Sequence, residues 1–151
     1  MQVEDIMTRV VFTCDAHASL ESVARVMWDH DCGYVPIVDE NEQLAGVVTD
    51  RDVAMAAYLH GRALADISVV EIMSRPVHSC TPTASVELAH QIMRSAEIRR
   101  LPVVDQNDKL IGLVTWSDLL AAAQRETSAS AAAALTRQAI ETLEATSAHS
   151  A

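Results

Sequence analysis

A repeat at one fixed offset of 66 residues constrains this chain more than any other feature. Residues 69–123 align with residues 3–57 without a gap, and 21 of the 55 aligned positions are identical. Three pairs of stretches carry most of the likeness: 5–8 with 71–74, 36–39 with 102–105, and 46–49 with 112–115. This many identities at a single offset indicate two copies of one supersecondary unit.

Apolar periodicity predicts the order β-α-β-β-α in the first copy. A short apolar run over 10–13 favours a strand, and the i, i+3, i+4, i+7 spacing after Ser19 predicts an amphipathic helix with Ser19 as its N-cap. Strands are expected over 34–38 and 44–48, separated by a polar turn, and a helix over 50–58.

The second copy repeats this order. Its expected elements are a strand over 77–79, a helix over 85–95, strands over 100–104 and 110–114, and a helix from 116. One copy of about 55 residues buries little surface alone. We therefore expect an α/β (α+β) fold in which two repeats, related by a pseudo-twofold axis, pack sheet against sheet and share a core.

The composition changes after the second copy. The expected domain boundaries are 1–62 for the first repeat, 63–124 for the second, and 125–151 for an alanine-rich tail. Alanine has the highest helix propensity, so residues 131–143 can form a helix. The apolar face of that helix is mostly alanine, which predicts a tail that is mobile or docked on a partner.

Charge and hydropathy exclude several classes of partner. The formal net charge is −10, so no basic face is available for duplex DNA or RNA. No apolar run approaches the roughly 20 residues needed to span a bilayer, and the acidic N-terminus is unlike a secretory signal. Cys14, Cys32 and Cys80 form no CxxC pair, which argues against disulfides and structural zinc. A cytoplasmic protein with no membrane contact is expected.

The second strand of each copy ends in the same pattern, Gly-apolar-Val-Thr-x-x-Asp. It occupies Gly46, Thr49 and Asp52, and again Gly112, Thr115 and Asp118. A strand that leads directly into a helix leaves the first helical N–H groups unpaired, and these favour a phosphate. The threonine hydroxyl can donate to that phosphate, and the aspartate can accept two hydrogen bonds from a sugar diol.

The same pattern has a purely structural interpretation. Thr-x-x-Asp is also a capping box, in which the two side chains satisfy the end of the helix and bind nothing else. Its recurrence in both copies does not separate the two interpretations, because both helices need a cap.

The surrounding order of motifs resembles the cystathionine-β-synthase-type (CBS) motif, which occurs in tandem as the Bateman module. The resemblance covers residues 3–123 and rests on the Asp5-Ile6-Met7-Thr8 segment, the Pro-(Ile/Val)-Val-Asp strands and the Gly-(Val/Leu)-Val-Thr-x-x-Asp corners. It implies a regulatory module that binds AMP, ADP or ATP in clefts between the motifs, with NAD and S-adenosylmethionine as less favoured candidates. It also implies a homodimer, signalling through dimer or partner contacts to an unidentified effector protein.

Carried over to this sequence, the family pattern implies two sets of binding residues. The first set is Thr115, Ser117, Asp118, Arg99 and Arg100, in which the aspartate holds ribose and the others meet phosphate. Arginine suits phosphate because its planar fork is permanently charged.

The second set is Thr49, Arg51 and Asp52. Gly33 and Tyr34 stand here where the other copy has two arginines, which predicts weaker binding or a less charged ligand. Tyr34 is a candidate to line a base, or a core residue.

The resemblance places adenine against the Ile-Met segments and the first strands. The candidates are Ile6, Met7, Ile72 and Met73, with Thr13 and Ser79 offering hydroxyl groups. Methionine fits irregular gaps well, although all four apolar residues are equally well explained as core.

Three rival functions remain open at this stage. An enzyme is disfavoured because the six histidines fall in no catalytic motif. A metal or redox module is conceivable because Cys14 and Cys80 are equivalent and His78 lies two residues from Cys80, but buried structural thiols are the simpler interpretation. A structural adaptor with empty clefts is the third rival.

Overall fold

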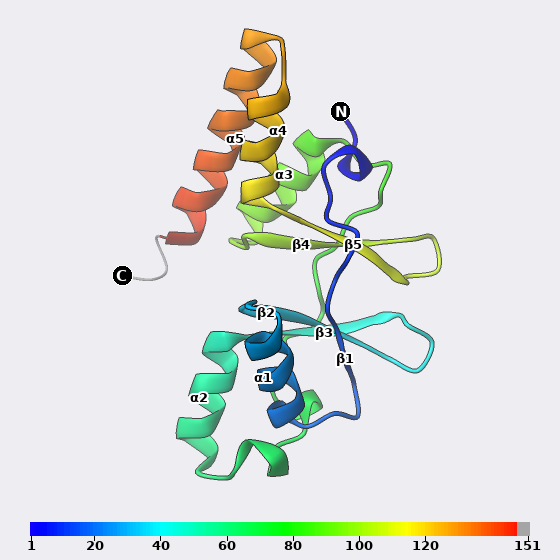
Figure 1. Cartoon of the computed structure of the whole chain (residues 1–151), viewed down its shortest axis with the longest axis vertical. Coiled ribbons are helices and arrows are strands. Elements are labelled where there is room, and N and C mark those ends of the chain that lie inside the picture. Colours follow the sequence, from blue (N-terminus) through cyan, green and yellow to red (C-terminus); the bar gives the residue numbers. More distant parts are fainter. Residues whose placement is uncertain (148–151) are drawn as a thin grey trace. The chain divides into compact units, whose positions relative to one another are not determined.

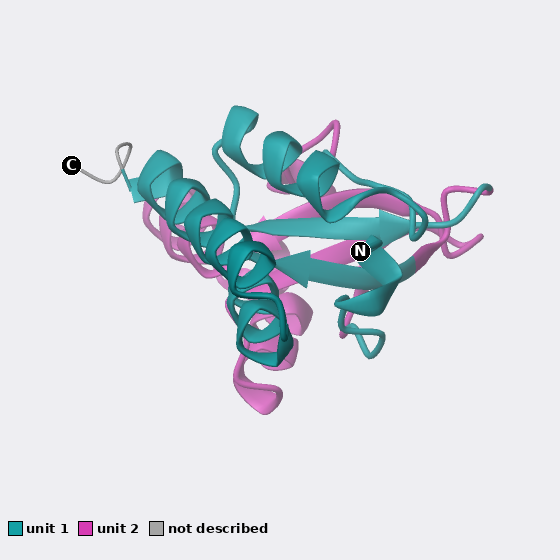
Figure 2. Cartoon of the chain, turned by 90° about the horizontal axis from the view of Figure 1, so that it is seen from above, with its two compact units in different colours: residues 1–11, 78–106, 111–151 teal, residues 12–77, 107–110 magenta. Residues whose placement is uncertain are grey.

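The structure is a computed structural model, and residues 1–147 are described. The chain divides into two compact units (Figures 1 and 2). Unit 1 comprises residues 1–11, 78–106 and the chain from 111 onward, and unit 2 comprises residues 12–77 and 107–110. Each unit has its own cluster of buried apolar side chains, where the sequence predicted one shared core.

Unit 2 is a three-stranded sheet with two helices. Its elements are β1 (Cys14–Asp15), α1 (Leu20–Asp29), β2 (Tyr34–Val38), β3 (Leu44–Thr49) and α2 (Asp50–His60). The strand order is β1-β2-β3, with β1 parallel and β3 antiparallel to β2. The side chain of Ser19 accepts a hydrogen bond from the Ser22 amide, which confirms Ser19 as the N-cap of α1.

Unit 1 has the equivalent elements and one more helix. They are α3 (Val86–Ser95), β4 (Arg100–Val104), β5 (Leu110–Thr115), α4 (Trp116–Arg125) and α5 (Ala129–Ser147). β4 and β5 form a two-stranded sheet, and Cys80 makes an isolated parallel bridge to Val103 in place of a third strand. The predicted mixed α/β fold, with its helices and its β2 to β5 strands, is confirmed.

The first strand of each copy lies later in the sequence than predicted. The expected strand over 10–13 is wrong, because the pairing begins at Cys14 and residue Val10 is 74% exposed. In the second copy Cys80, not residues 77–79, makes the equivalent bridge. The apolar run at 10–13 lacks a sheet partner and joins the two units instead of entering a core.

The two Ile-Met segments are exchanged between the repeats. Thr8, from the first repeat, pairs with Leu113 of β5, and Ser74, from the second, pairs with Val47 of β3. Three short 3-10 helices, at Val3–Asp5, Leu64–Asp66 and Val69–Glu71, accompany these segments. Each unit is therefore completed by a segment that belongs to the other repeat in sequence.

A glycine makes room for each exchanged methionine. A Cβ atom on Gly112 would lie 2.7 Å from the sulfur of Met7, and one on Gly46 would lie 2.5 Å from the sulfur of Met73. Neither glycine has a positive φ, so space and not backbone conformation requires it. This explains why the corner pattern begins with glycine in both copies.

The alanine-rich segment forms α5, which packs on α4 and α3 within unit 1. The helix expected over 131–143 lies within α5, which is longer than expected, and the described part of the tail packs on unit 1. Leu135 and Ala139 enter the core, and the Thr142 hydroxyl contacts His90 of α3. No helix within residues 1–147 is long and apolar enough to cross a membrane.

Candidate functional site

The two strand-to-helix corners have the same hydrogen-bond pattern. In α2, the Thr49 amide and hydroxyl each donate to Oδ2 of Asp52 at 2.8 Å, and the Asp52 amide donates back to the Thr49 hydroxyl at 3.2 Å. In α4, Thr115 and Asp118 repeat these contacts at 2.7, 2.7 and 3.4 Å. Both corners are complete capping boxes, so the structural interpretation of the pattern holds in both copies.

The amide groups at these corners are mostly used by the protein. The Trp116 amide donates to the carbonyl oxygen of Arg99 at 3.2 Å, and the Asp50 amide donates to that of Gly33 at 3.2 Å. The expectation of free amides for a phosphate is therefore wrong at most positions, because the loop before β2 or β4 supplies an acceptor. Among residues 1–147, the Ser117 amide of the α4 corner has no protein acceptor.

Unit 1 brings together the predicted residues of the basic set. Arg99 and Arg100 are exposed at the start of β4, and the bond from the Trp116 amide to the Arg99 carbonyl holds this start beside the α4 corner. At the corner, the hydroxyl oxygens of Thr115 and Ser117 lie 2.7 Å apart.

The apolar candidates of the same unit lie on the exchanged segment. Ile6 and Met7 are buried, and Thr8 beside them pairs with β5, the strand that ends at Thr115. Ser79 is half-buried next to Cys80. The exchange therefore brings Ile6 and Met7 into the unit that contains Thr115, Ser117 and Asp118.

Unit 2 holds the other predicted residues: Thr13, Tyr34, Thr49, Arg51, Asp52, Ile72 and Met73. Its corner is more acidic than its counterpart. A Cβ atom on Gly33 would lie 2.6 Å from Oδ2 of Asp50, so this carboxylate occupies the space beside Gly33. Asp50 corresponds to Trp116 in the other repeat. The sequence analysis did not predict that Asp50 adds negative charge to the unit 2 corner.

Cys14 and Cys80, the equivalent cysteines of the two repeats, are free thiols buried in separate cores. Burial is the main cause that raises the pKa of Cys14, and burial raises the pKa of Cys80 to about 11. Cys14 belongs to the core of unit 2 and Cys80 to the core of unit 1. Within residues 1–147, no group of three or more His, Cys, Asp or Glu side chains is arranged to hold a metal ion.

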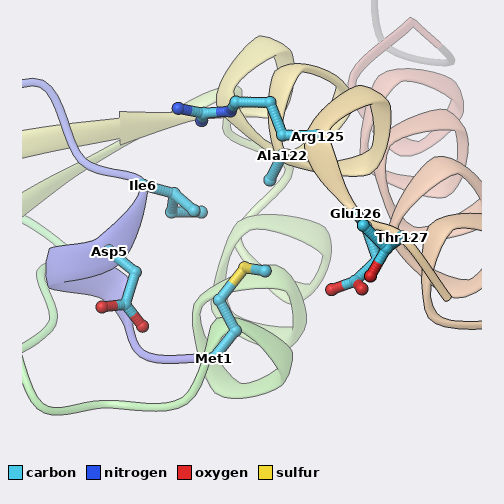
Figure 3. Close-up of a pocket in the computed structure, with 7 residues that line it drawn as sticks. All are labelled: Met1, Asp5, Ile6, Ala122, Arg125, Glu126 and Thr127. Atoms are coloured by element: carbon cyan, nitrogen blue, oxygen red, sulfur yellow. The ribbon is translucent and has the colours of Figure 1, made fainter.

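A cavity of about 280 Å³ lies at the opposite end of α4 from the Thr115 corner. Its lining residues are Met1, Asp5, Ile6, Ala122, Arg125, Glu126 and Thr127. Figure 3 shows Met1 and Ile6 reaching into this space from one side and Ala122 from the other. Ile6 is the one predicted binding residue that lines it, so the cavity is separate from the corner.

Both repeats match the model of the CBS domain, over residues 3–58 and 69–125. The chain belongs to the CBS domain family. It is 39% identical over 134 residues to the CBS domain-containing protein YhcV of Bacillus subtilis (strain 168), a match that covers 89% of this chain and 92% of YhcV.

A longer protein also contains a similar CBS stretch. The chain is 32% identical over 117 residues to homoserine O-acetyltransferase of Methanohalobium evestigatum, which covers 78% of this chain but 23% of that enzyme. The name of the enzyme therefore gives no activity to this CBS pair.

Three solved structures of similar fold contain ligands or metal ions. CBSX2 in complex with AMP has 25% identity and a TM-score of 0.73, covering 82% of this chain and 96% of that one. The CBS domain pair of MJ0100 with 5′-methylthioadenosine and S-adenosyl-L-methionine has 28% identity and a TM-score of 0.70, covering 79% and 92%. Hypoxic Response Protein I with two coordinated zinc ions has 28% identity and a TM-score of 0.72, covering 79% and 96%.

Proposed function

We propose that this CBS pair is a regulatory module that reversibly binds an adenine nucleotide, AMP, ADP or ATP, and catalyses no reaction. The adenosine compounds bound by CBSX2 and MJ0100 support the class of ligand. The observation that carries the proposal is the bond from the Trp116 amide to the Arg99 carbonyl. It holds two exposed arginines beside a corner that contains the hydroxyl groups of Thr115 and Ser117 and the carboxylate of Asp118.

Each residue of unit 1 has a distinct role in this proposal. Asp118 uses Oδ2 for the cap, so its other oxygen, Oδ1, accepts from the ribose hydroxyls. The guanidinium groups of Arg99 and Arg100 and the hydroxyl of Ser117 hold the phosphates. Ile6 and Met7, each 8% exposed, are the apolar candidates to contact adenine, and the Ser79 hydroxyl can bond to it.

The unit 2 set is proposed as a weaker site. Arg51 is its one cation near the corner, while Asp50 and Asp52 place two carboxylates there. A polyphosphate is repelled by this arrangement, so adenosine or a ligand of low negative charge fits it better. Thr13, Tyr34, Ile72 and Met73 are the candidates to surround the base.

A scaffold without a ligand is the second candidate function. The completed capping boxes favour it, because they give the Thr and Asp side chains that recur in both repeats a structural role without any bound molecule. A scaffold needs no cation at the Arg99 position, however, whereas a bound phosphate gives the exposed Arg99 side chain a partner.

Calorimetric titration of the full chain with adenosine, AMP, ADP, ATP, NAD and S-adenosylmethionine tests the proposal. We expect at least one adenine nucleotide to bind, and Arg100→Ala to weaken ATP roughly tenfold or more, since charged hydrogen bonds contribute about 1.5–3 kcal/mol. Adenosine should be affected much less. Arg125→Ala, at the far end of α4, is the matched control. If none of these ligands binds, the scaffold is correct.

We also propose that the module forms a homodimer. Helix α2 exposes three apolar side chains at i, i+3 and i+4 spacing: Met55 at 41%, Tyr58 at 79% and Leu59 at 71%. Apolar side chains grouped on one helix face are typical of a contact surface. Sedimentation should give twice the monomer mass of 16.4 kDa.

We further propose a cytoplasmic location, with which the free thiols agree. An effector protein would bind to the dimer or to α5.

A further inference from the structure

Helix α5 is held on unit 1 by a stripe that is only half apolar. Its buried residues are Leu135, Ala139, Thr142 and Thr146, at spacings of four, three and four along one face. A helix fixed permanently in a core usually carries larger aliphatic residues at such positions. The two threonines therefore make the C-terminal half of this contact weaker than it would be with aliphatic residues at the same positions.

The N-terminal half of α5 is also incompletely packed. A cavity of about 330 Å³ lies between this half, the start of α3 and the N-terminal segment. Ala131, Ala134 and Leu135 of α5 line it on one side. Unfilled space next to alanine reduces the dispersion energy that holds the helix in place.

A polar cluster fixes the position of the C-terminal half. His90 of α3 is 3% exposed, and its Nδ1 lies 3.0 Å from the Thr142 hydroxyl while its Nε2 lies 3.2 Å from a carboxylate oxygen of Glu141. That same oxygen lies 3.6 Å from the Arg94 guanidinium group. Because both ring nitrogens face α5, this cluster makes the docked position of the helix specific.

The two helices under α5 carry the two parts of the proposed phosphate site. Helix α3 leads into Arg99 and Arg100, and α4 begins at the Thr115 corner. Figure 1 shows α5 running back along α4, so that its C-terminal half reaches the level of the corner. One bond, from the Trp116 amide to the Arg99 carbonyl, links the two parts directly.

We propose that docking of α5 and occupancy of the unit 1 site are coupled, so that a bound nucleotide phosphate tightens α5 and a loosened α5 weakens the nucleotide. A phosphate held by Arg100 and Ser117 fixes the end of α3 relative to the start of α4. Helix α5 contacts both α3 and α4, so it docks only when these two helices hold the same relative position. The inference rests on the proposed nucleotide binding and adds α5 as the element that reports it.

Coupling between nucleotide binding and α5 docking must act equally in both directions. If the nucleotide favours the docked helix by some factor, docking favours the nucleotide by the same factor, and such factors are typically about 5 to 150. Two full-length variants change docking in opposite directions. His90→Ala removes the polar cluster, whereas Thr146→Val replaces a hydroxyl that bonds only to carbonyl groups of its own helix.

The experiment combines hydrogen exchange of α5 peptides with nucleotide titration. We expect saturating AMP to slow exchange in α5 of the unmodified protein roughly fivefold or more. Without ligand, α5 should exchange faster in His90→Ala and more slowly in Thr146→Val. The dissociation constant for AMP should rise in the first variant and fall in the second. His17→Ala, an exposed histidine of unit 2, is the matched control.

The outcomes separate this inference from the proposed function. If AMP binds, but exchange in α5 is unchanged and both variants bind with the affinity of the unmodified protein, the coupling is wrong and the proposed function stands. If no nucleotide binds at all, both are wrong. Thr146→Val retains the His90 cluster, so the test does not depend on the folding of His90→Ala.

Discussion

The two corners show how a repeat can keep its fold and change its chemistry. Thr49 with Asp52 and Thr115 with Asp118 make the same three hydrogen bonds, to within about 0.2 Å. Outside the cap the charges differ, since Asp50 lies against Gly33 in unit 2 while Arg99 lies beside Trp116 in unit 1. The Thr and Asp of each cap are constrained because they satisfy the helix end. The residues that flank the cap have no such constraint and can differ in charge between the repeats.

The helices that follow the corners differ in the same way. Helix α4 is covered by α5, and its outer positions Ala121, Gln124 and Arg125 are exposed and small or polar. The equivalent positions of α2 are Met55, Tyr58 and Leu59, and this helix has no fifth helix beside it within unit 2. One copy thus covers its second helix within the chain, and the other presents an apolar surface.

The largest expected difference between the units concerns the two glycines. In Gly46→Ala the new Cβ meets three atoms of Met73 at 2.5, 2.8 and 3.0 Å, so the whole side chain must move. In Gly112→Ala the contacts are longer, at 2.7 Å to the Met7 sulfur, 3.2 Å to the Thr8 carbonyl oxygen and 3.3 Å to Met7 Cγ. Overpacking costs about 1–3 kcal/mol, so we expect the first substitution near the upper limit and the second near the lower.

Thermal unfolding checks this prediction. A loss of 1 kcal/mol lowers the melting temperature by roughly 2–4 °C in a chain of this length. The combination of Gly46→Ala with Met73→Ala should cost less than the sum of the single changes, because the clash is removed. Equal losses for both glycines, or strict additivity, would show that the methionines do not set the need for glycine.

The next largest effect separates the cap from the ligand. Asp52→Ala and Asp118→Ala should each cost about 1 kcal/mol of unfolding free energy, because each removes a capping residue. The loss should be slightly smaller for Asp118→Ala, since the Thr115 hydroxyl keeps the Ser117 hydroxyl as a partner at 2.7 Å. AMP affinity should fall in Asp118→Ala and change little in Asp52→Ala.

Chemical denaturation and calorimetry give the two quantities for each variant. Addition of Ser117→Ala to Asp118→Ala removes the substitute partner and should increase the stability loss toward that of Asp52→Ala. If Asp118→Ala loses stability but binds AMP unchanged, the aspartate only caps the helix, and the ribose contact is wrong.

The smallest effect concerns the thiols and needs no substitution. A raised pKa lowers the fraction of thiolate, and with a pKa of about 11 roughly one Cys80 in a thousand is ionised at pH 8. A backbone hydrogen bond at Asp15 partly opposes the effect of burial on Cys14, so Cys14 should be less resistant. Iodoacetamide should therefore label half-buried Cys32 first and Cys80 last.

Mass spectrometry of peptides over a pH series measures the order of labelling. The rate at Cys80 should rise roughly tenfold per pH unit up to about pH 11, since only the thiolate reacts. In denaturant all three cysteines should react alike. Rapid labelling of Cys80 at pH 8 in the folded protein would reopen the redox interpretation.

The sequence predicted the repeat, the amphipathic helices and the strands β2 to β5, because their periodicity is local. It also predicted the caps at Thr49 and Thr115, whose partners lie three residues away. It failed for residues 10–13, since an apolar run forms a strand only if a partner strand is available. The partners of Met7 and Met73 depend on contacts between repeats, and no pattern within one repeat specifies them.

The site was predicted in its residues but not in its hydrogen bonds. The sequence indicated Arg99 as a phosphate ligand because of its charge. In the structure its carbonyl oxygen also holds the start of β4 beside the start of α4. The docking of α5 was missed because its alanines suggested a weak contact, whereas His90 supplies a specific one from 52 residues earlier. A buried histidine in an amphipathic helix was the signal that could have indicated it.

The exchanged segments have a consequence for synthesis. Thr8 leaves the ribosome long before its partner Leu113, 105 positions later, so the N-terminal segment must remain unpaired while most of the chain is translated. Ser74 meets Val47 after a delay of only 27 positions. The half encoded first can therefore mature early, whereas the N-terminal segment can pair only after β5 has been made.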